Sequence, residues 1–225
     1  MKQEQKALLS WYSLNSRDLP WRKTKDPYKI WISEIMLQQT RAAAVIPYYN
    51  KFIKKFPTVG VLAKAKIESV LEMWSGLGYY SRARNIHKAA QALDKSGFPK
   101  TYQELLEYVG FGPYTARAVA SFAFGQSAAV LDGNVIRVLS RLRGQRLAWW
   151  TTKGRNELQS LADEMVEDTD SAPINQAMME VGATICLPQN PNCLLCPFQK
   201  NCVARKQGTQ STLPLKKDKK KNEIW

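Results

Sequence analysis

The 225-residue sequence predicts an all-α protein. In one segment after another, apolar residues recur at the three-to-four-residue spacing of an amphipathic helix. Prolines and glycines stand between these segments, where helices begin and end. Only a short apolar run at 128–131 suggests a strand. With 44% hydrophobic residues, the chain can bury the core of one large domain or of two small ones.

The predicted helices follow one another with short connections. The first is expected at 4–14, and an irregular polar segment follows at 17–23. The second begins at Asp26-Pro27, because proline is well tolerated in the first turn of a helix, and is expected to reach Thr40. The remaining helices are expected at 46–55, 67–74, 82–94, 101–108, 114–124, 134–143, 153–167 and 172–184. The tail at 207–225 is rich in lysine, and we expect it to be a disordered linker.

The charge balance predicts a polyanionic partner. The chain has 33 Lys and Arg against 19 Asp and Glu, a net charge of +14. Five of these basic and two of these acidic residues lie in 216–225, so the folded part is itself basic. A generally basic, soluble surface is the plainer alternative. No apolar run is long enough to span a membrane, Met1–Gln5 lacks the apolar core of a signal peptide, and a single histidine excludes multi-His chemistry.

A glycine turn precedes the helix at 114–124. Gly110 and Gly112 permit positive φ and the close approach of another backbone. Free N–H groups at the start of the following helix attract phosphate. We therefore interpret Gly110 and Gly112 as a grip on a DNA backbone; the alternative is a hairpin whose glycines only allow close packing. About one helix later comes Asp132, a lone carboxylate in an apolar neighbourhood and a candidate catalytic acid.

Glu34 is a second candidate acid. Its neighbours Ile32, Ile35 and Met36 are apolar, and a carboxyl in such surroundings should have a raised pKa and donate a proton near neutral pH. The alternative is a solvent-facing glutamate. The polar end of the same helix, Gln38–Arg41, favours the functional interpretation because such side chains hydrogen-bond to base edges.

Two further segments combine arginine with aromatic residues. Arg17–Lys23 suits DNA contact by phosphate pairing and stacking, although a loop pinned by a buried Trp21 is equally consistent. Gly76–Arg84 places two tyrosines on a glycine turn beside arginines, an arrangement that suits wedging into a distorted duplex. The alternative there is a turn between helices with core aromatics.

All four cysteines lie close together near the C-terminal end. Their spacing is Cys-x6-Cys-x2-Cys-x5-Cys. Four thiolates in one loop surround either a [4Fe–4S] cluster or a tetrahedral zinc ion, and spacing alone does not choose between them. The predicted metal ligands are Cys186, Cys193, Cys196 and Cys202.

Together these segments resemble the helix-hairpin-helix DNA glycosylases that carry an iron–sulfur cluster, and most of all the MutY-type adenine DNA glycosylases. The resemblance covers nearly the whole chain and is specific because many separate motifs match. The family hairpin often has proline and valine where this chain has Val109 and Phe111. The matching motifs are Leu19–Arg22, Ser33–Thr40, Gly76–Asn85, Leu131–Val135, Asn175–Met179 and the cysteine spacing.

The resemblance implies two helical lobes with a cleft for a flipped adenine. One lobe, expected at 26–133, is a six-helix barrel with the hairpin; the other, expected at 1–25 with 134–206, holds a [4Fe–4S] cluster. The implied partner is double-stranded DNA with adenine opposite 8-oxoguanine or guanine. We expect a monomeric, cytoplasmic bacterial protein that acts at the nucleoid. The family's C-terminal 8-oxoguanine-recognition domain is expected to be absent, which should weaken discrimination for 8-oxoguanine over guanine.

The resemblance also implies residue roles for base removal, which needs an acid on the base and a negative charge near the sugar cation. Glu34 is implied to protonate adenine at N7, and Asp132 to stabilise the cation, directly or through a transient covalent bond. Tyr114 and Asn134 are implied to support this pair. Base flipping exposes the adenine. Gln39 and Tyr79 are implied to fill or probe the gap at the opposite base. The residues implied to contact the extruded adenine or its surroundings are Arg17, Trp21, Arg22, Leu37 and Gln176.

Other members of the same fold remain alternatives. Endonuclease III-type enzymes have a lysine two residues after the second hairpin glycine, which forms a Schiff base. Here Tyr114 stands at that position, and no lysine occurs between Tyr102 and Leu147. We therefore expect base removal without efficient strand cleavage. Thymine-mismatch glycosylases also have tyrosine there, so this position does not exclude them. A non-catalytic iron–sulfur DNA-binding protein is the rival from another class.

Overall fold

A computed structural model describes residues 1–217 as two compact units. One unit comprises 18–128 and contains the glycine turn, and we call it the hairpin unit. The other combines 1–17 with the chain from Ala129 onward, and we call it the cysteine unit. Within residues 1–217 every regular element is a helix, so the prediction of an all-α fold is confirmed. None of these helices has the length and apolar character that a membrane span requires.

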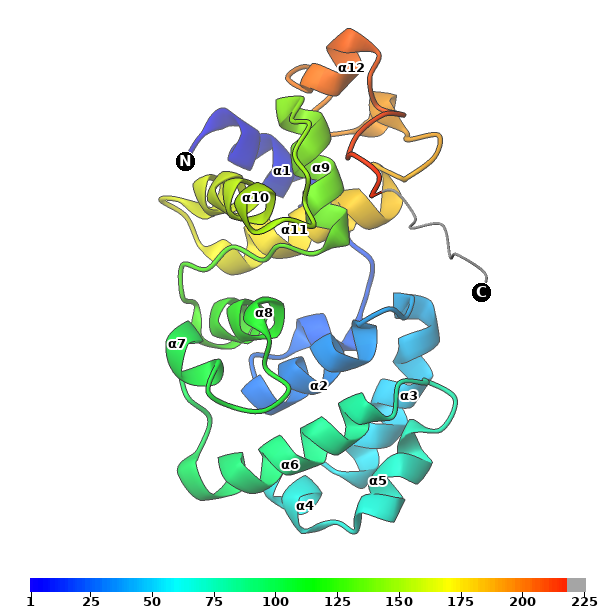
Figure 1. The fold of residues 1–225 in the computed structure, drawn as a ribbon, viewed down its shortest axis with the longest axis vertical. Coiled ribbons are helices and arrows are strands. Elements are labelled where there is room, and N and C mark those ends of the chain that lie inside the picture. Colours follow the sequence, from blue (N-terminus) through cyan, green and yellow to red (C-terminus); the bar gives the residue numbers. More distant parts are fainter. Residues whose placement is uncertain (218–225) are drawn as a thin grey trace, which may run out of the picture. The chain divides into compact units, whose positions relative to one another are not determined.

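The hairpin unit is organised around α2 (Figure 1). This helix packs against α3, α8 and η1, while α4 and α5 pack on α6 and α7 packs on α8. The elements of the unit are η1 (Pro20–Lys23), α2 (Pro27–Leu37), α3 (Ala42–Lys55), α4 (Val59–Lys64), α5 (Ile67–Trp74), α6 (Ser81–Ser96), α7 (Tyr102–Leu105) and α8 (Pro113–Phe124).

Helix α2 forms because its start is capped and its length is buried. The Asp26 carboxylate accepts a hydrogen bond from the Tyr28 backbone N–H at 2.9 Å, and Pro27 occupies the first helical position. Eight of its eleven residues are buried, as expected for a helix that is apolar on all sides. Trp31 is fully buried and its ring stacks on that of Phe111, with centroids 5.1 Å apart. The hairpin turn is therefore anchored to α2 by an aromatic pair.

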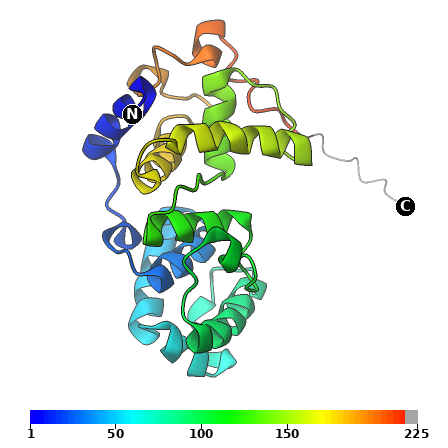
Figure 2. The same cartoon turned by 90° about the vertical axis from the view of Figure 1, so that its left-hand side faces the viewer.

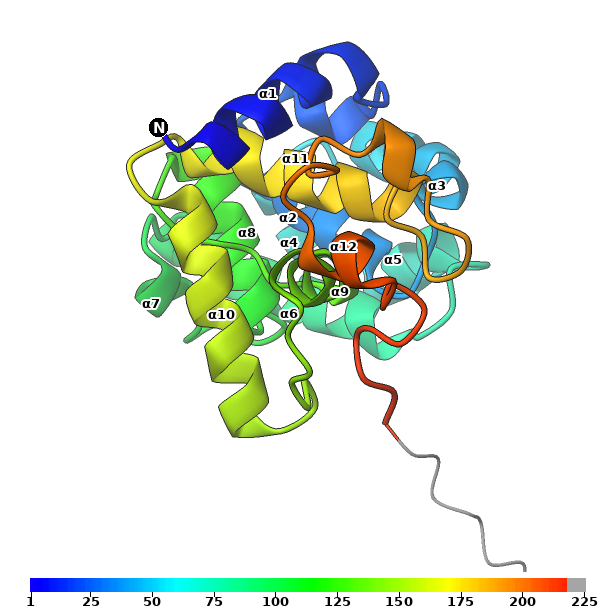
Figure 3. The ribbon, with the colours of Figure 1, turned by 90° about the horizontal axis from the view of Figure 1, so that it is seen from above.

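The cysteine unit is organised around α9. Helices α10, α11 and α12 all pack against α9, and α1 packs on α11. Figure 2 shows α10 crossing α9, and Figure 3 shows α1 beside α11 and α12 over α9. The elements are α1 (Gln3–Asn15), α9 (Gly133–Arg143), α10 (Thr152–Val166), α11 (Ser171–Thr184), η2 (Cys193–Leu195) and α12 (Val203–Gln207).

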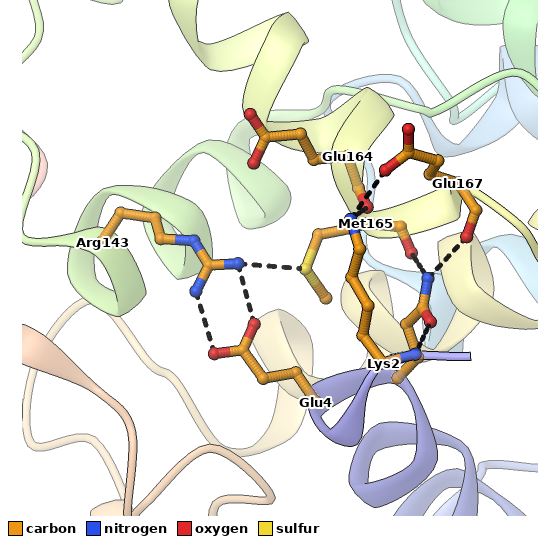
Figure 4. A network of polar contacts seen from close by, with 7 residues as sticks. Lys2, Glu4, Arg143, Glu164, Met165 and Glu167 are labelled. Atoms are coloured by element: carbon orange, nitrogen blue, oxygen red, sulfur yellow. Dashed lines mark hydrogen bonds and ion pairs between the residues drawn. The ribbon is translucent and has the colours of Figure 1, made fainter.

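The start of the chain is held to α9 and α10 by charged and polar contacts (Figure 4). Two Arg143 nitrogens donate to the two Glu4 carboxylate oxygens at 2.9 and 2.8 Å, and Lys2 pairs with Glu167 at 2.7 Å. Gln5 is fully buried, and its amide nitrogen donates to the carbonyl oxygens of Met165 and Glu167 at 3.1 and 2.8 Å. This side chain satisfies carbonyl groups near the end of α10 that the helix itself leaves without partners.

The predicted helix positions are largely confirmed, with several differences. Helix α2 ends at Leu37 and not at Thr40, because the backbone turns at Gln39, where φ is 60°. The run at 128–131 forms no strand, and α4 and α12 were not expected. The prediction of a disordered linker at 207–225 is wrong for 209–215. Residues 218–225 lie outside the described range.

The segment 209–215 is packed onto the cysteine unit. Leu213 is 3% exposed and its carbonyl oxygen accepts a hydrogen bond from Arg141 Nε at 2.9 Å. The Leu215 carbonyl oxygen accepts one from Trp149 Nε1 at 3.0 Å. This segment is therefore a strap and not a linker. The units of the structure change at 17/18 and 128/129; the lobe boundaries expected at 25/26 and 133/134 stay a prediction.

Gln5→Ala should destabilise the cysteine unit. The substitution removes the donor from one buried and one partly buried carbonyl group, and an unsatisfied buried group costs about 1–3 kcal/mol. We expect a lower urea midpoint for unfolding, measured by circular dichroism. Gln3→Ala is the matched control, because Gln3 is exposed on the same helix. Equal midpoints for the two variants would contradict the proposed role of the Gln5 amide.

Candidate functional site

Glu34 is buried inside the hairpin unit, so the solvent-facing alternative is wrong. The residue is 3% exposed on α2. The Tyr114 hydroxyl, from the first turn of α8, donates to Glu34 Oε2 at 2.6 Å. This contact follows from the packing of α2 on α8. Beside it, Gln38 Nε2 lies 3.4 Å from Thr115 Oγ1. The structure therefore brings together two of the predicted catalytic residues, Glu34 and Tyr114.

Asp132 stands at the start of α9 in the cysteine unit. Its Oδ1 accepts a hydrogen bond from the Val135 backbone N–H at 2.7 Å, as an N-cap does, and its Oδ2 accepts one from Asn134 Nδ2 at 3.0 Å. Burial raises the pKa of Asp132 above its ordinary value, while these hydrogen bonds and the charge of Arg137 act in the opposite direction. Asn134 thus contacts Asp132, and its implied role in supporting catalysis stays a prediction.

A chain of hydrogen bonds connects Asp132 to the cysteine loop. Asn134 donates to Asp132, and Asn134 Oδ1 in turn accepts a bond from Arg137 Nη2 at 2.8 Å. Arg137 also donates to the carbonyl oxygens of Gly182 and Cys186, both at 2.7 Å. No sequence pattern singles out Arg137, because one arginine on an amphipathic helix is ordinarily a surface residue.

The four cysteines line one pocket, and none forms a disulfide. Two non-cysteine side chains reach the sulfurs: Arg141 Nη1 lies 3.4 Å from Cys186 Sγ, and Gln210 Nε2 lies 3.9 Å from Cys193 Sγ. Arg141 is 2% exposed and also donates to the Leu187 carbonyl oxygen at 2.6 Å. Within residues 1–217, no three His, Cys, Asp or Glu side chains are arranged to hold a single metal ion.

The hairpin glycines differ in what they require. Gly110 has φ of 86°, and a Cβ there would lie 3.2 Å from the Asn85 Cβ, so a positive φ and a close approach coincide. Gly112 is the N-cap of α8, has an ordinary φ of −79° and has open space around it. The phosphate-grip interpretation of both glycines stays a prediction.

Two of the implied DNA-probing residues lie in tight turns. Gln39 follows α2 and Tyr79 precedes α6; their φ angles are 60° and 49°, a region that non-glycine residues rarely adopt. Both side chains are exposed, Tyr79 by 62%. Leu37 is the last residue of α2.

The residues implied to surround adenine are distributed over both units. In the hairpin unit, Trp21 is 7% exposed and its ring packs edge-on against that of Tyr49. A buried Trp21 therefore holds the loop, as the alternative interpretation predicted. Arg22 follows it in η1. In the cysteine unit, Gln176 Oε1 accepts a hydrogen bond from the Tyr12 hydroxyl at 2.9 Å. Contact of any of these side chains with a base stays a prediction.

Arg17 has a partner that the sequence did not reveal. Its Nε and Nη2 donate to the two carboxylate oxygens of Glu180 at 2.6 and 2.9 Å. Glu180 is fully buried, and the hydrogen bond to its carboxylate is the largest cause that raises the pKa of Arg17. A further missed residue is Asn175, whose side-chain oxygen accepts from the Val130 backbone N–H at 2.9 Å and holds the segment before Asp132.

Comparison with known proteins now identifies the family. A family model described as "HhH-GPD superfamily base excision DNA repair protein" matches residues 32–167. The chain therefore belongs to the HhH-GPD superfamily of base excision DNA repair proteins.

Curated relatives extend this result. The chain is 43% identical to the adenine DNA glycosylase of Homo sapiens over 219 residues, covering 92% of this chain and 40% of the human protein. It is 39% identical to that of Buchnera aphidicola subsp. Baizongia pistaciae over 235 residues, covering 97% and 64%. The predicted resemblance to MutY-type adenine DNA glycosylases is thus confirmed. The chain spans between two fifths and just under two thirds of the length of these relatives.

Solved structures confirm the predicted fold. A thermostable thymine-DNA glycosylase matches with a TM-score of 0.81 and 30% identity, covering 91% of this chain and 98% of that one. A non-covalent endonuclease III–DNA complex matches with a TM-score of 0.75 and 24% identity, covering 93% and 100%.

The stability difference between the wild type and Asp132→Asn should depend on pH. An acid whose pKa is raised by folding stabilises the folded state below its unfolded pKa, and this contribution is lost as pH rises through the folded pKa. Asparagine keeps a capping oxygen but no charge. We therefore expect Asp132→Asn to be the more stable protein at pH 7, with a smaller gap towards pH 4. A constant gap in urea unfolding would contradict the raised pKa.

Gly182→Ala should displace the start of α9. A Cβ at Gly182 would lie 2.6 Å from the Asn134 Cβ and 3.1 Å from its Cα, so the helices must separate. Overpacking of this kind costs about 1–3 kcal/mol. We expect a lower melting temperature and an altered Asp132–Asn134 pair. Gly133→Ala is the control, because a Cβ there meets nothing within 4 Å; equal melting temperatures would show that the helices yield without cost.

Proposed function

We propose that this chain is an adenine DNA glycosylase that removes adenine paired with 8-oxoguanine or guanine by hydrolysis of the N-glycosidic bond. The observation that carries the proposal is the pair of carboxylates, one per unit, each with a defined hydrogen-bond partner. Tyr114 donates to Glu34, and Asn134 donates to Asp132. Relatives named adenine DNA glycosylase at 38–44% identity support adenine as the base.

The two carboxyl groups suit opposite roles. Glu34, in an apolar helix, protonates the departing adenine and then takes the proton of the attacking water. Asp132 remains available as a carboxylate opposite the sugar cation, held by the Val135 N–H and by Asn134. The bond between sugar and base breaks, water adds its oxygen to the sugar, and adenine leaves as the neutral base.

Tyrosine at the lysine position of the lyases supports a monofunctional enzyme. Strand cleavage through a Schiff base needs a lysine at the hairpin helix. Tyr114 occupies that position, and its hydroxyl is bonded to Glu34. We therefore expect an abasic site in an intact strand.

The cysteine pocket is proposed to hold a [4Fe–4S] cluster, with zinc as the alternative. All four cysteines line the same pocket, and four thiolates suit either group. The resemblance to the glycosylases that carry an iron–sulfur cluster favours the cluster. A cluster supplies four separate irons for the thiolates and would fix the loop between Cys186 and Cys202. Elemental analysis for iron and zinc per chain, with the visible absorption spectrum, distinguishes the two.

Double-stranded DNA is the proposed partner. The net charge of +14, the hairpin at Gly110 and the exposed turns at Gln39 and Tyr79 support it. A thymine-mismatch enzyme is the second candidate, because the solved thymine-DNA glycosylase matches at 30% identity over nearly its whole length.

The decisive assay uses duplexes that each hold one A·8-oxoG, A·G, T·G or thymine-glycol pair. After incubation, alkali reveals abasic sites, and a parallel sample without alkali reports lyase activity. We expect breaks in the first two duplexes, and only after alkali. Breaks confined to the T·G or glycol duplex would reject adenine as the substrate.

Glu34→Gln should abolish base removal and leave DNA binding intact. Loss of a general acid costs about 10²–10⁴-fold in rate, whereas an amide of the same shape keeps a hydrogen-bond acceptor for Tyr114. Single-turnover excision and a binding titration on the same duplex measure the two properties. Glu68→Gln, an exposed carboxylate on α5, is the control. Unchanged excision in Glu34→Gln would refute the assignment of the acid.

A further inference from the structure

Two turns of the hairpin unit adopt uncommon backbone conformations. Gln39 and Tyr79 both have positive φ, and neither is glycine. Residues in such conformations persist only when the surrounding structure over-determines them. The two turns are far apart in sequence, one after α2 and one before α6. Something must therefore hold each of them, and the hydrogen bonds identify a single side chain.

The guanidinium of Arg82 contacts both turns. Its Nη1 donates to the carbonyl oxygens of Ile35, Met36 and Gln38 at 2.8, 3.3 and 2.7 Å. Its Nη2 lies 3.2 Å from each of the carbonyl oxygens of Leu77 and Gly78. Nη1 thus donates hydrogen bonds to carbonyl groups at the end of α2, and Nη2 donates them to carbonyl groups of the turn before α6.

These carbonyl groups need donors because of where they lie. The last carbonyls of a helix have no partner within the helix, and α2 stops at Leu37 without a glycine cap. A planar guanidinium presents several N–H groups in a fixed fork, whereas a lysine ammonium has three donors on one atom. Only arginine therefore spans both sets of acceptors from one position.

Aromatic rings hold the guanidinium in place. The Arg82 Cζ lies 5.5 Å from the centre of the Trp74 ring and 5.4 Å from that of Tyr79. Trp74 Nε1 donates to the Gly78 carbonyl oxygen at 3.2 Å, which fixes the same turn a second time. The small cavity beside Arg82 is also bounded by Gly110 of the hairpin. Arg82 consequently lies where three of the predicted DNA-contacting segments of this unit meet: the end of α2, the turn before α6 and the hairpin.

We propose that Arg82 is a positioning residue that locks the Gln39 turn and the Tyr79 turn into one arrangement, so that both side chains are presented together to the same stretch of DNA. The part of this inference that concerns DNA rests on the proposed function. The coupling of the two turns does not, and it is tested first.

Amide hydrogen exchange of the wild-type protein tests the coupling without any substitution. If Arg82 joins the turns, the amides of 38–40 and 77–80 open as one unit, with the same opening equilibrium and the same dependence on denaturant. In Arg82→Lys, both segments should exchange about tenfold faster or more, while the middle of α2 keeps its protection. Lys88→Gln, an exposed cation on the same helix, should behave as the wild type. Separate opening of the two segments overturns the proposal.

DNA binding tests the consequence. The ratio of affinities for a duplex with one A·8-oxoG pair and for a fully paired duplex should fall about tenfold in Arg82→Lys, the effect of losing one base-reading contact. Affinity for the paired duplex should not change, because the charge is retained. Gln39→Ala should produce a similar loss, and the double variant should lose less than the product of the two factors, since Arg82 acts through Gln39.

The outcomes separate the two proposals. The positioning role is refuted if the double variant loses the full product of the two single-variant factors in the affinity ratio. It is also refuted if the affinity ratio of Arg82→Lys equals that of the wild type. Joint opening of both turns in a protein that excises no adenine confirms the coupling and refutes the proposed function alone.

Discussion

The cysteine unit depends on the hydrogen bonds made along α9. Asp132, the residue before this helix, caps its N-terminus. Farther along the helix, Arg137 donates a hydrogen bond to the Cys186 carbonyl oxygen. About one turn later, Arg141 donates hydrogen bonds to the carbonyl oxygens of Leu187 and Leu213. Arg137 and Arg141 are four residues apart, so they lie on one face of α9. Helix α9 therefore fixes the distance between the candidate catalytic carboxylate and the cysteine loop. A change in the position of the start of α9 should alter the positions of both.

The two candidate acids are stabilised by different means. Glu34 is surrounded by side chains of a helix buried on all sides, and a tyrosine hydroxyl is its neighbour. Asp132 sits at a helix N-terminus, where backbone N–H groups favour negative charge while burial disfavours it. For Asp132 burial is the larger effect and raises the pKa, while the hydrogen bonds to its carboxylate act in the opposite direction. The two candidate acids, one in each unit, therefore differ in local environment.

The sequence predicted the helices, the cysteine loop and both carboxylates because each leaves a local pattern: periodicity, capping residues, or a polar residue in an apolar run. It did not predict the partners Arg137, Glu180 and Arg82. Each of these acts across a long separation in sequence, from residue 82 to residue 35 or from 17 to 180, and nothing in the local pattern separates it from a surface charge. The end of α2 was also misplaced, since the carbonyl oxygen of Gln38 accepts a hydrogen bond from the distant Arg82 side chain and no glycine marks the end of the helix.

The strap at 209–215 determines where a stable fragment can be cut. It buries Leu213 and supplies carbonyl acceptors to Arg141 and Trp149. A fragment ending at Cys202 would keep every predicted metal ligand, yet it would leave a hydrophobic site open and a buried arginine short of an acceptor. For protein engineering, a fragment of the cysteine unit therefore needs to extend at least to Leu215.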